Sequence, residues 1–120
     1  MKKMMLQIAG ADKKNPSLQI EVADSFCTRL RGLMGRKSLA EGQGLLIAPC
    51  SSIHMCFMRF AIDAVYIDRE YRVLKVVKGL RPWIGLSICW KAWAVIELPA
   101  DTSLLNGINI GNQLNLKTIS

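Results

Sequence analysis

Three blocks decide the fold class of this chain: RLRGLMGRKSL at residues 29–39, GLLI at residues 44–47 and HMCFMRFAIDAVYID at residues 54–68. The first block has the apolar spacing of a short helix that stops at a glycine, and the other two contain buried strands separated by turns. Charged residues stand inside these apolar runs. The blocks therefore predict a small core that holds polar side chains in specific places.

Segments on both sides extend the strand pattern. Alternating or continuous apolar runs predict strands in the N-terminal segment MKKMMLQIAGA and at residues 18–22, 44–49, 52–58, 62–68, 71–78, 93–98 and 113–119. A helix is expected at residues 25–34, capped by Asp24 or Ser25 and ended by Gly35. Arg69 and Glu70 form a tight hairpin without the usual Gly or Asn, and residues 79–91 read as a long connection. The expected fold is all-β: a compact sandwich or jelly-roll-like barrel with one short helix, in a single domain over residues 1–120.

The composition is that of a globular domain with a basic surface. The chain has 120 residues and is 51% hydrophobic, which is enough for one well-filled core and excludes a disordered chain. Its net charge of +7 predicts attraction to anionic partners. An acidic protein or a membrane surface is the expected partner, because no motif of specific nucleic-acid recognition is present.

The N-terminal segment resembles an export signal only in part. Two lysines precede an apolar run, but Gln7 interrupts that run and Asp12 ends it. No segment reaches the ~20 apolar residues of a membrane span. The expected location is the cytoplasm, with export to the periplasm as the alternative.

Two carboxylates stand on apolar strand faces. Asp63 shares its face with Val65 and Ile67, and Glu97 shares its face with Trp93 and Val95. Each must be paired or have a raised pKa, because an unpaired buried charge is too costly. The expected partners of these carboxylates are Arg29, Arg31 and His54, with Arg29 the first choice for Asp63.

Two interpretations of this group remain open. In the structural interpretation, Asp63 and Glu97 anchor loops or the helix by buried polar contacts. In the functional one, a pocket serves a hydrolase-like enzyme with His54, Asp63 and Glu97 as acid–base candidates; its lining would be Arg29, His54, Met58, Asp63 and Glu97. The sequence favours a binding or accessory module without catalysis or cofactor, because it contains no recognised nucleophile motif or phosphate loop.

Soft ligands gather near His54. Cys56 and Met58 alternate with it on one strand face and Cys50 precedes it, a set that suits copper or zinc. One strand spaces such side chains ~6.6 Å apart, so a tight site would need a ligand from elsewhere, such as Cys89. We therefore expect no bound metal and a packed face of thiols and thioethers.

Aromatic and basic residues mix in the region of residues 78–93. The candidates for a partner-binding surface are Arg81, Trp83, Trp90 and Lys91. The alternative is that the tryptophan rings cover the end of the barrel.

These blocks together resemble a small bacterial family known as domain of unknown function 192. The similarity covers about residues 22–116 and is carried by Arg29, Gly32, Leu33, Met34, Arg36, Leu39, Gly44, Leu45, Leu46, His54, Met58, Ile62, Asp63, Ile67, Asp68, the segment VIELPA at residues 95–100, Gly111 and Leu114. The resemblance implies a jelly-roll type sandwich in which Gly32, Leu33, Met34, Gly44 and Gly111 are structural. It implies no established reaction. Asp101 and Asn112 depart from the family pattern.

Overall fold

The computed structural model describes residues 2–8, 18–23, 43–54, 60–81, 84–100 and 108–118. These ranges contain only strands: β1 (Lys2–Ile8), β2 (Leu18–Ala23), β3 (Gln43–Ile47), β4 (Ser52–His54), β5 (Ile62–Ile67), β6 (Val73–Leu80), β7 (Leu86–Ile88), β8 (Ala94–Pro99) and β9 (Leu114–Thr118). The all-β prediction is confirmed. The expected helix at residues 25–34 lies outside the described residues.

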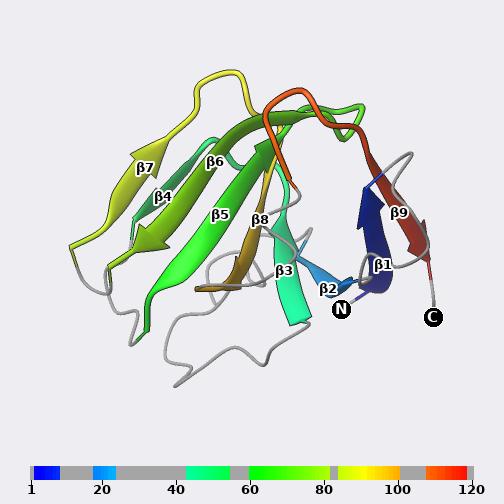
Figure 1. Ribbon diagram of the computed structural model, residues 1–120, viewed down its shortest axis with the longest axis horizontal. Helices are drawn as coiled ribbons and strands as arrows, with labels where there is room; N and C mark the ends of the chain where they lie inside the picture. Colours follow the sequence, from blue (N-terminus) through cyan, green and yellow to red (C-terminus); the bar gives the residue numbers. More distant parts are fainter. Residues whose placement is uncertain are drawn as a thin grey trace.

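The strands form one large sheet and one small sheet (Figure 1). The large sheet has the order β6-β5-β8-β3-β2-β1-β9, and only the β2–β3 pair is parallel. Its two edge strands meet at a bridge between Arg72 and Gln113, and the Leu114 amide donates to the Tyr71 carbonyl at 2.9 Å. The large sheet therefore curls towards a barrel, and the small sheet, β4–β7, lies beside it.

Alternation along the strands gives the large sheet two apolar faces. The inner face collects side chains from all seven strands: Leu6, Ile20, Leu46, Val65, Ile67, Val73, Ala94, Ile96, Leu98 and Leu114. The outer face carries a second cluster, made by Leu45, Ile47, Ile62, Ala64, Tyr66, Leu80 and Val95. Cys50 and Cys89, which flank the small sheet, pack against this second cluster. The small sheet thus covers part of the outer face.

Strand β7 corrects the sequence prediction of a long connection at residues 79–91. Leu86 and Ile88 face solvent while Ser87 between them is buried, so the usual polarity of a half-buried strand is reversed. A pattern that places polar residues inside and apolar residues outside does not read as a strand. The strand predicted at residues 52–58 is described only as β4 (Ser52–His54), because residues 55–59 lie outside the described ranges.

The β5–β6 hairpin forms without Gly or Asn in its turn. The Asp68 side chain replaces them: its Oδ1 accepts the backbone amides of Glu70 at 2.9 Å and Arg72 at 3.0 Å. Tyr71 takes the left-handed conformation, with φ of 64°, and its ring centroid lies 6.0 Å from that of Trp93. Local hydrogen bonds and ring packing thus hold a conformation that glycine usually supplies.

Gly44 stands where β3 leaves no room for a side chain. A Cβ atom there would lie 2.8 Å from Leu98 Cδ2, 2.9 Å from Ile20 Cγ2 and 3.1 Å from the Glu97 carbonyl oxygen. We expect Gly44→Ala to lower the free energy of unfolding by about 1–3 kcal/mol, because the inner core must shift to admit the methyl group. Urea unfolding measures this loss. A variant as stable as the wild type would show that the strands are not packed this closely.

Candidate functional site

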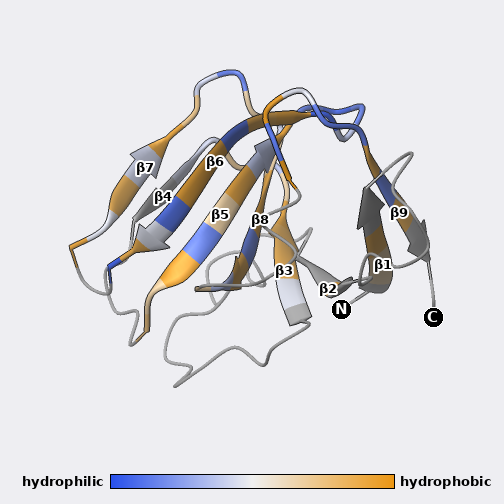
Figure 2. Cartoon of the chain, in the orientation of Figure 1, coloured by the Kyte–Doolittle hydropathy of each residue, from blue (hydrophilic) through white to orange (hydrophobic). Residues whose placement is uncertain are grey.

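The two buried carboxylates lie on opposite faces of the large sheet. In the β5–β8 register, Asp63 pairs with Leu98 and Ala64 pairs with Glu97. Leu98 belongs to the inner apolar cluster and Ala64 to the outer one. Because side chains that share a register position point to the same face, Asp63 faces the inside of the curled sheet and Glu97 faces the outside. Figure 2 shows the hydrophilic bands within the otherwise apolar β5 and β8.

Asp63 holds a β-bulge together. Ile62 pairs with Leu80 and Ala64 with Val77, so Lys78 and Gly79 together oppose Asp63. The Gly79 amide donates to Asp63 Oδ1 at 2.8 Å, and Gly79 has a φ of +68°, which a side chain would strain. Asp63 is 2% exposed. These contacts are those of an internal anchor between β5 and β6.

Glu97 is buried in a different way. It pairs with Leu45 on one side and Ala64 on the other, and it is 6% exposed. Among the residues that the structure describes, no hydrogen bond or ion pair reaches its carboxyl group. Burial alone raises the pKa of Glu97 to about 7. This carboxyl group is therefore able to exchange a proton near neutral pH, which is a property of functional carboxylates as well as of strained core residues.

Tyr66 is the polar neighbour of Glu97 on the outer face, and the sequence analysis missed it. Its hydroxyl donates to the Ser87 carbonyl at 3.0 Å and so ties the large sheet to β7. Burial raises the pKa of Tyr66 above 10.0, and the nearby Cys50, Cys89 and Glu97 add to that rise. The signal was available, because Tyr66 is the only side chain with a polar tip on the outer face of β5.

The small sheet contains one buried hydroxyl group without a partner. Ser87 Oγ makes no hydrogen bond within the described part of the chain. The Cys50 thiol donates to the Ser52 carbonyl at 3.0 Å. Tyr66, Glu97, Ser87 and the two thiols thus form a polar group under the small sheet.

Several predicted site residues fall outside the described ranges. His54 is placed by its backbone only, opposite Leu86 in the β4–β7 pair. Seven of the predicted site and motif residues lie outside the described ranges: Arg29, Gly32, Leu33, Met34, Cys56, Met58 and Trp83. Within the described ranges, no group of three or more His, Cys, Asp or Glu residues could hold a metal ion. The predicted pocket around His54 stays a prediction.

Strand β7 and the turns on either side of it carry four exposed apolar side chains, which we call the β7 stripe. Its members and their exposed fractions are Ile84 (74%), Leu86 (65%), Ile88 (37%) and Trp90 (83%). Leu86 and Ile88 alternate with the buried Ser87 and so point to the same face of β7, whereas Ile84 and Trp90 lie in the turns before and after the strand. Trp90 therefore does not cover the barrel end, whereas Trp93 is half-buried against Tyr71.

Basic residues surround the β7 stripe. Arg81 and Lys91 are exposed on either side of it, and the Lys75 ammonium donates to the Ile88 carbonyl at 2.9 Å. Residues 71–96 contain five basic residues and no acidic one. The stripe thus combines apolar side chains with a positive local charge.

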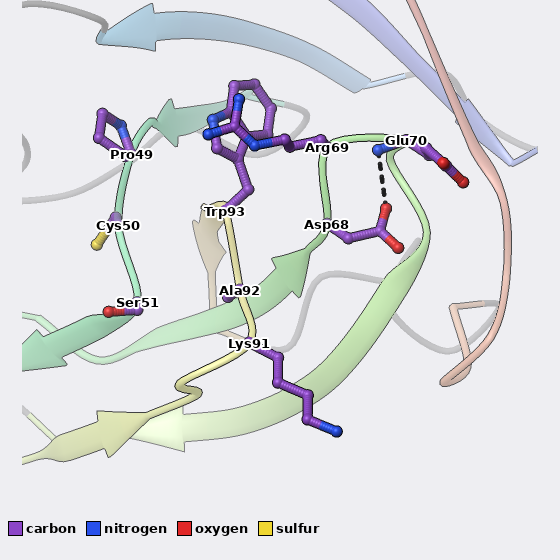
Figure 3. A pocket seen from close by; sticks show the side chains of 9 residues that line it. All are labelled: Pro49, Cys50, Ser51, Asp68, Arg69, Glu70, Lys91, Ala92 and Trp93. Carbon is purple, nitrogen blue, oxygen red and sulfur yellow. Dashed lines mark hydrogen bonds between the residues drawn. The ribbon is translucent and has the colours of Figure 1, made fainter.

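A pocket of about 590 Å³ has Lys91, the residue that follows Trp90, in its lining (Figure 3). Three connections line it: residues 49–51 after the cis Ala48–Pro49 bond, residues 68–70 of the hairpin turn, and residues 91–93. Its walls carry two acidic side chains, Asp68 and Glu70, and two basic ones, Arg69 and Lys91. The dashed line in Figure 3 marks the Glu70 amide bound to Asp68, which commits that carboxylate to the turn.

Comparison with known proteins assigns the chain to a family. The DUF192 family, described as "Uncharacterized ACR, COG1430", matches residues 7–116. The chain belongs to this family. A UPF0127 protein of Thermococcus sibiricus is 29% identical over 102 residues, which cover 81% of this chain and 65% of that protein. The UPF0127 protein PH1112 of Pyrococcus horikoshii is 37% identical over 68 residues, which cover 54% of this chain and 58% of that protein. Both relatives are archaeal, so the description of the DUF192 family as bacterial was too narrow.

Two crystal structures share the fold. A protein of Sinorhizobium meliloti, provisionally described as a transcription regulator, matches with a TM-score of 0.80 and 21% identity over 96% of this chain and 92% of that chain. A protein of unknown function from Novosphingobium aromaticivorans matches with a TM-score of 0.74 and 16% identity over 94% of this chain and 83% of that chain. This DUF192 chain thus belongs to an uncharacterised family with a recurrent fold. Among its described residues, no helix has the length and apolar character needed to cross a membrane.

Proposed function

We propose that this DUF192 chain is a binding module without chemistry of its own, and that the β7 stripe is its contact surface. The observation that carries the proposal is the group of four large apolar side chains that are exposed to solvent on β7 and in the turns that flank it. A contiguous patch of exposed apolar side chains often marks an interaction site, whereas single exposed apolar residues are common and need no explanation. The family match over residues 7–116 supports treating the chain as one domain.

The charge around the stripe defines the chemistry of the partner. Arg81 and Lys91 flank it, and the absence of acidic residues from positions 71–96 leaves their charge uncompensated within that segment. A partner that presents negative charge beside apolar groups is therefore complementary. We place this contact in the cytoplasm, with export as the alternative, because four cysteines without a CxxC pattern suit a reducing compartment.

An anionic apolar dye tests this surface without knowledge of the partner. We expect bis-ANS to bind the folded protein and to bind Leu86→Ser and Arg81→Gln several-fold more weakly. The first change removes an apolar contact with the dye, and the second removes a positive charge that attracts it. Ile110→Ser is the matched control, since Ile110 is 70% exposed in the turn before β9. Dye fluorescence is titrated on variants whose melting temperatures match the wild type. Equal dye affinity of all three variants would contradict the proposal.

The hydrolase-like pocket stays an alternative proposal. The raised pKa of Glu97 favours it. The opposite faces of Asp63 and Glu97 weigh against it, because these two carboxylates do not point into one common cavity. An enzyme of this kind would rely on Glu97 with Tyr66 rather than on Asp63.

A further inference from the structure

We infer that the β7 stripe docks this protein on an anionic lipid surface. The inference rests on the proposed binding function and names the partner of the same surface. The shape of the stripe is the first argument. A standard protein–protein interface takes roughly 20–30 residues and ~800 Å² from each partner. The stripe offers four large side chains on one short strand and its two flanking turns, and no other described large apolar side chain near it is exposed.

A lipid surface needs no such area. A row of apolar side chains can enter the boundary between headgroups and acyl chains without a complementary shape opposite it. The residue types of the stripe fit that environment. Trp90, 83% exposed, has an indole that combines an apolar body with a polar N–H, and tryptophan is enriched at the level of the headgroups.

The charges supply the second part of the attraction. Arg81 and Lys91 stand at the two ends of the stripe, where their long side chains are able to reach headgroup phosphates. The two ends differ. Lys91 lines the pocket of Figure 3 together with Asp68, Arg69 and Glu70, so two carboxylates lie in its neighbourhood. Arg81 does not line that pocket. Arg81 is therefore the stronger electrostatic contact.

Arg72 provides a charge control for Arg81, because the two arginines stand at opposite ends of β6. It is exposed like Arg81, but it lies at the seam where β6 meets Gln113 next to β9. Figure 1 shows β7 and β9 on opposite sides of the molecule. A basic residue at the seam should therefore contribute little to docking through β7.

Co-sedimentation with vesicles tests the inference. The probe is vesicles with roughly 30 mol% phosphatidylglycerol in phosphatidylcholine, compared with pure phosphatidylcholine. We expect the wild type to bind the anionic vesicles and to lose most of that binding at about 0.5 M salt. Arg81→Gln should weaken binding about fivefold and Lys91→Gln less. Leu86→Ser should weaken binding about tenfold, because it removes apolar contact. Arg72→Gln and Ile110→Ser should bind like the wild type.

The outcomes separate this inference from the proposed function. No binding to anionic vesicles, or equal losses for Arg81→Gln and Arg72→Gln, overturns the lipid assignment. If the stripe variants still bind bis-ANS more weakly than the wild type in that case, the stripe is a binding surface and its partner is an acidic protein. If the stripe variants Leu86→Ser and Arg81→Gln change neither dye affinity nor vesicle binding, the proposed function itself is wrong. Binding to vesicles that is lost in Arg81→Gln and Leu86→Ser, but kept in both controls, supports the inference.

Discussion

Asp63→Ala should lower the free energy of unfolding by about 3–5 kcal/mol, a loss typical of removing one member of a buried charged contact. The Asp63 carboxylate is 2% exposed and accepts the Gly79 amide at 2.8 Å within the β-bulge of β6. Without it, the Gly79 amide loses its protein acceptor and the bulge loses the group that shapes it. Equilibrium urea unfolding measures this loss.

Two further variants separate the hydrogen bond from the charge. Asp63→Asn keeps an oxygen that accepts the Gly79 amide, so a small loss assigns the effect to that bond and a loss equal to that of alanine assigns it to the charge. Lys78→Ala is the matched control, because Lys78 occupies the same bulge with an exposed side chain and should cost less than about 0.5 kcal/mol. Asp63→Ala with a melting temperature like that of the wild type would exclude an anchoring role.

The sequence also predicts the charged partner of this anchor. If Arg29 pairs with Asp63, the double variant Asp63→Ala/Arg29→Ala should cost much less than the sum of the two single changes, because neither charge is then left alone. Additive losses would show that Arg29 binds elsewhere. The double-mutant cycle is thus the experiment that decides between Arg29 and another partner.

Much of the large sheet is predictable from local pattern, because period-two alternation reports which residues share a face. It placed Asp63 with Val65 and Ile67, and Glu97 with Val95, as the structure has them. It was wrong to add Trp93 to the face of Glu97, because Trp93 precedes β8 and packs against the inner cluster. It could not relate the two faces, because only the β5–β8 register sets Asp63 opposite Leu98 rather than opposite Glu97. The sequence therefore allowed a pocket that contained both Asp63 and Glu97. The long-range pairing of β5 with β8 places them on opposite faces of the sheet.

Strand β7 shows a different limit. Its apolar residues point to solvent, so its pattern carries no sign of the core that alternation normally reports. The same inversion makes β7 the candidate binding surface, because exposed apolar side chains at these positions add little to the core. The hairpin turn at Asp68 is a smaller case, in which one side-chain oxygen with two amides does the work of a glycine. Local rules fail in both places for reasons that the tertiary contacts explain.

The stability of this protein should depend on pH through Glu97, and Glu97→Gln should remove that dependence. The ordinary pKa of a glutamate is 4.5, and burial raises that of Glu97 to about 7 in the folded state. Between these values the folded protein binds a proton that the unfolded chain has released, so folding is favoured at low pH and weakened as the pH rises. The shift corresponds to about 3 kcal/mol of stability lost between about pH 4.5 and pH 7.

Glutamine has nearly the shape of protonated glutamic acid and does not titrate. At about pH 5 we expect Glu97→Gln to be as stable as the wild type, and at about pH 8 we expect it to be more stable by up to about 3 kcal/mol. Urea midpoints at both pH values, taken as the difference between variant and wild type, cancel the titration of all other groups. Glu70→Gln is the matched control, because the Glu70 side chain is exposed in the hairpin turn. A variant that runs parallel to the wild type across this pH range would mean that the Glu97 carboxylate is stabilised by a partner or by water, and that it is not a desolvated group under the small sheet.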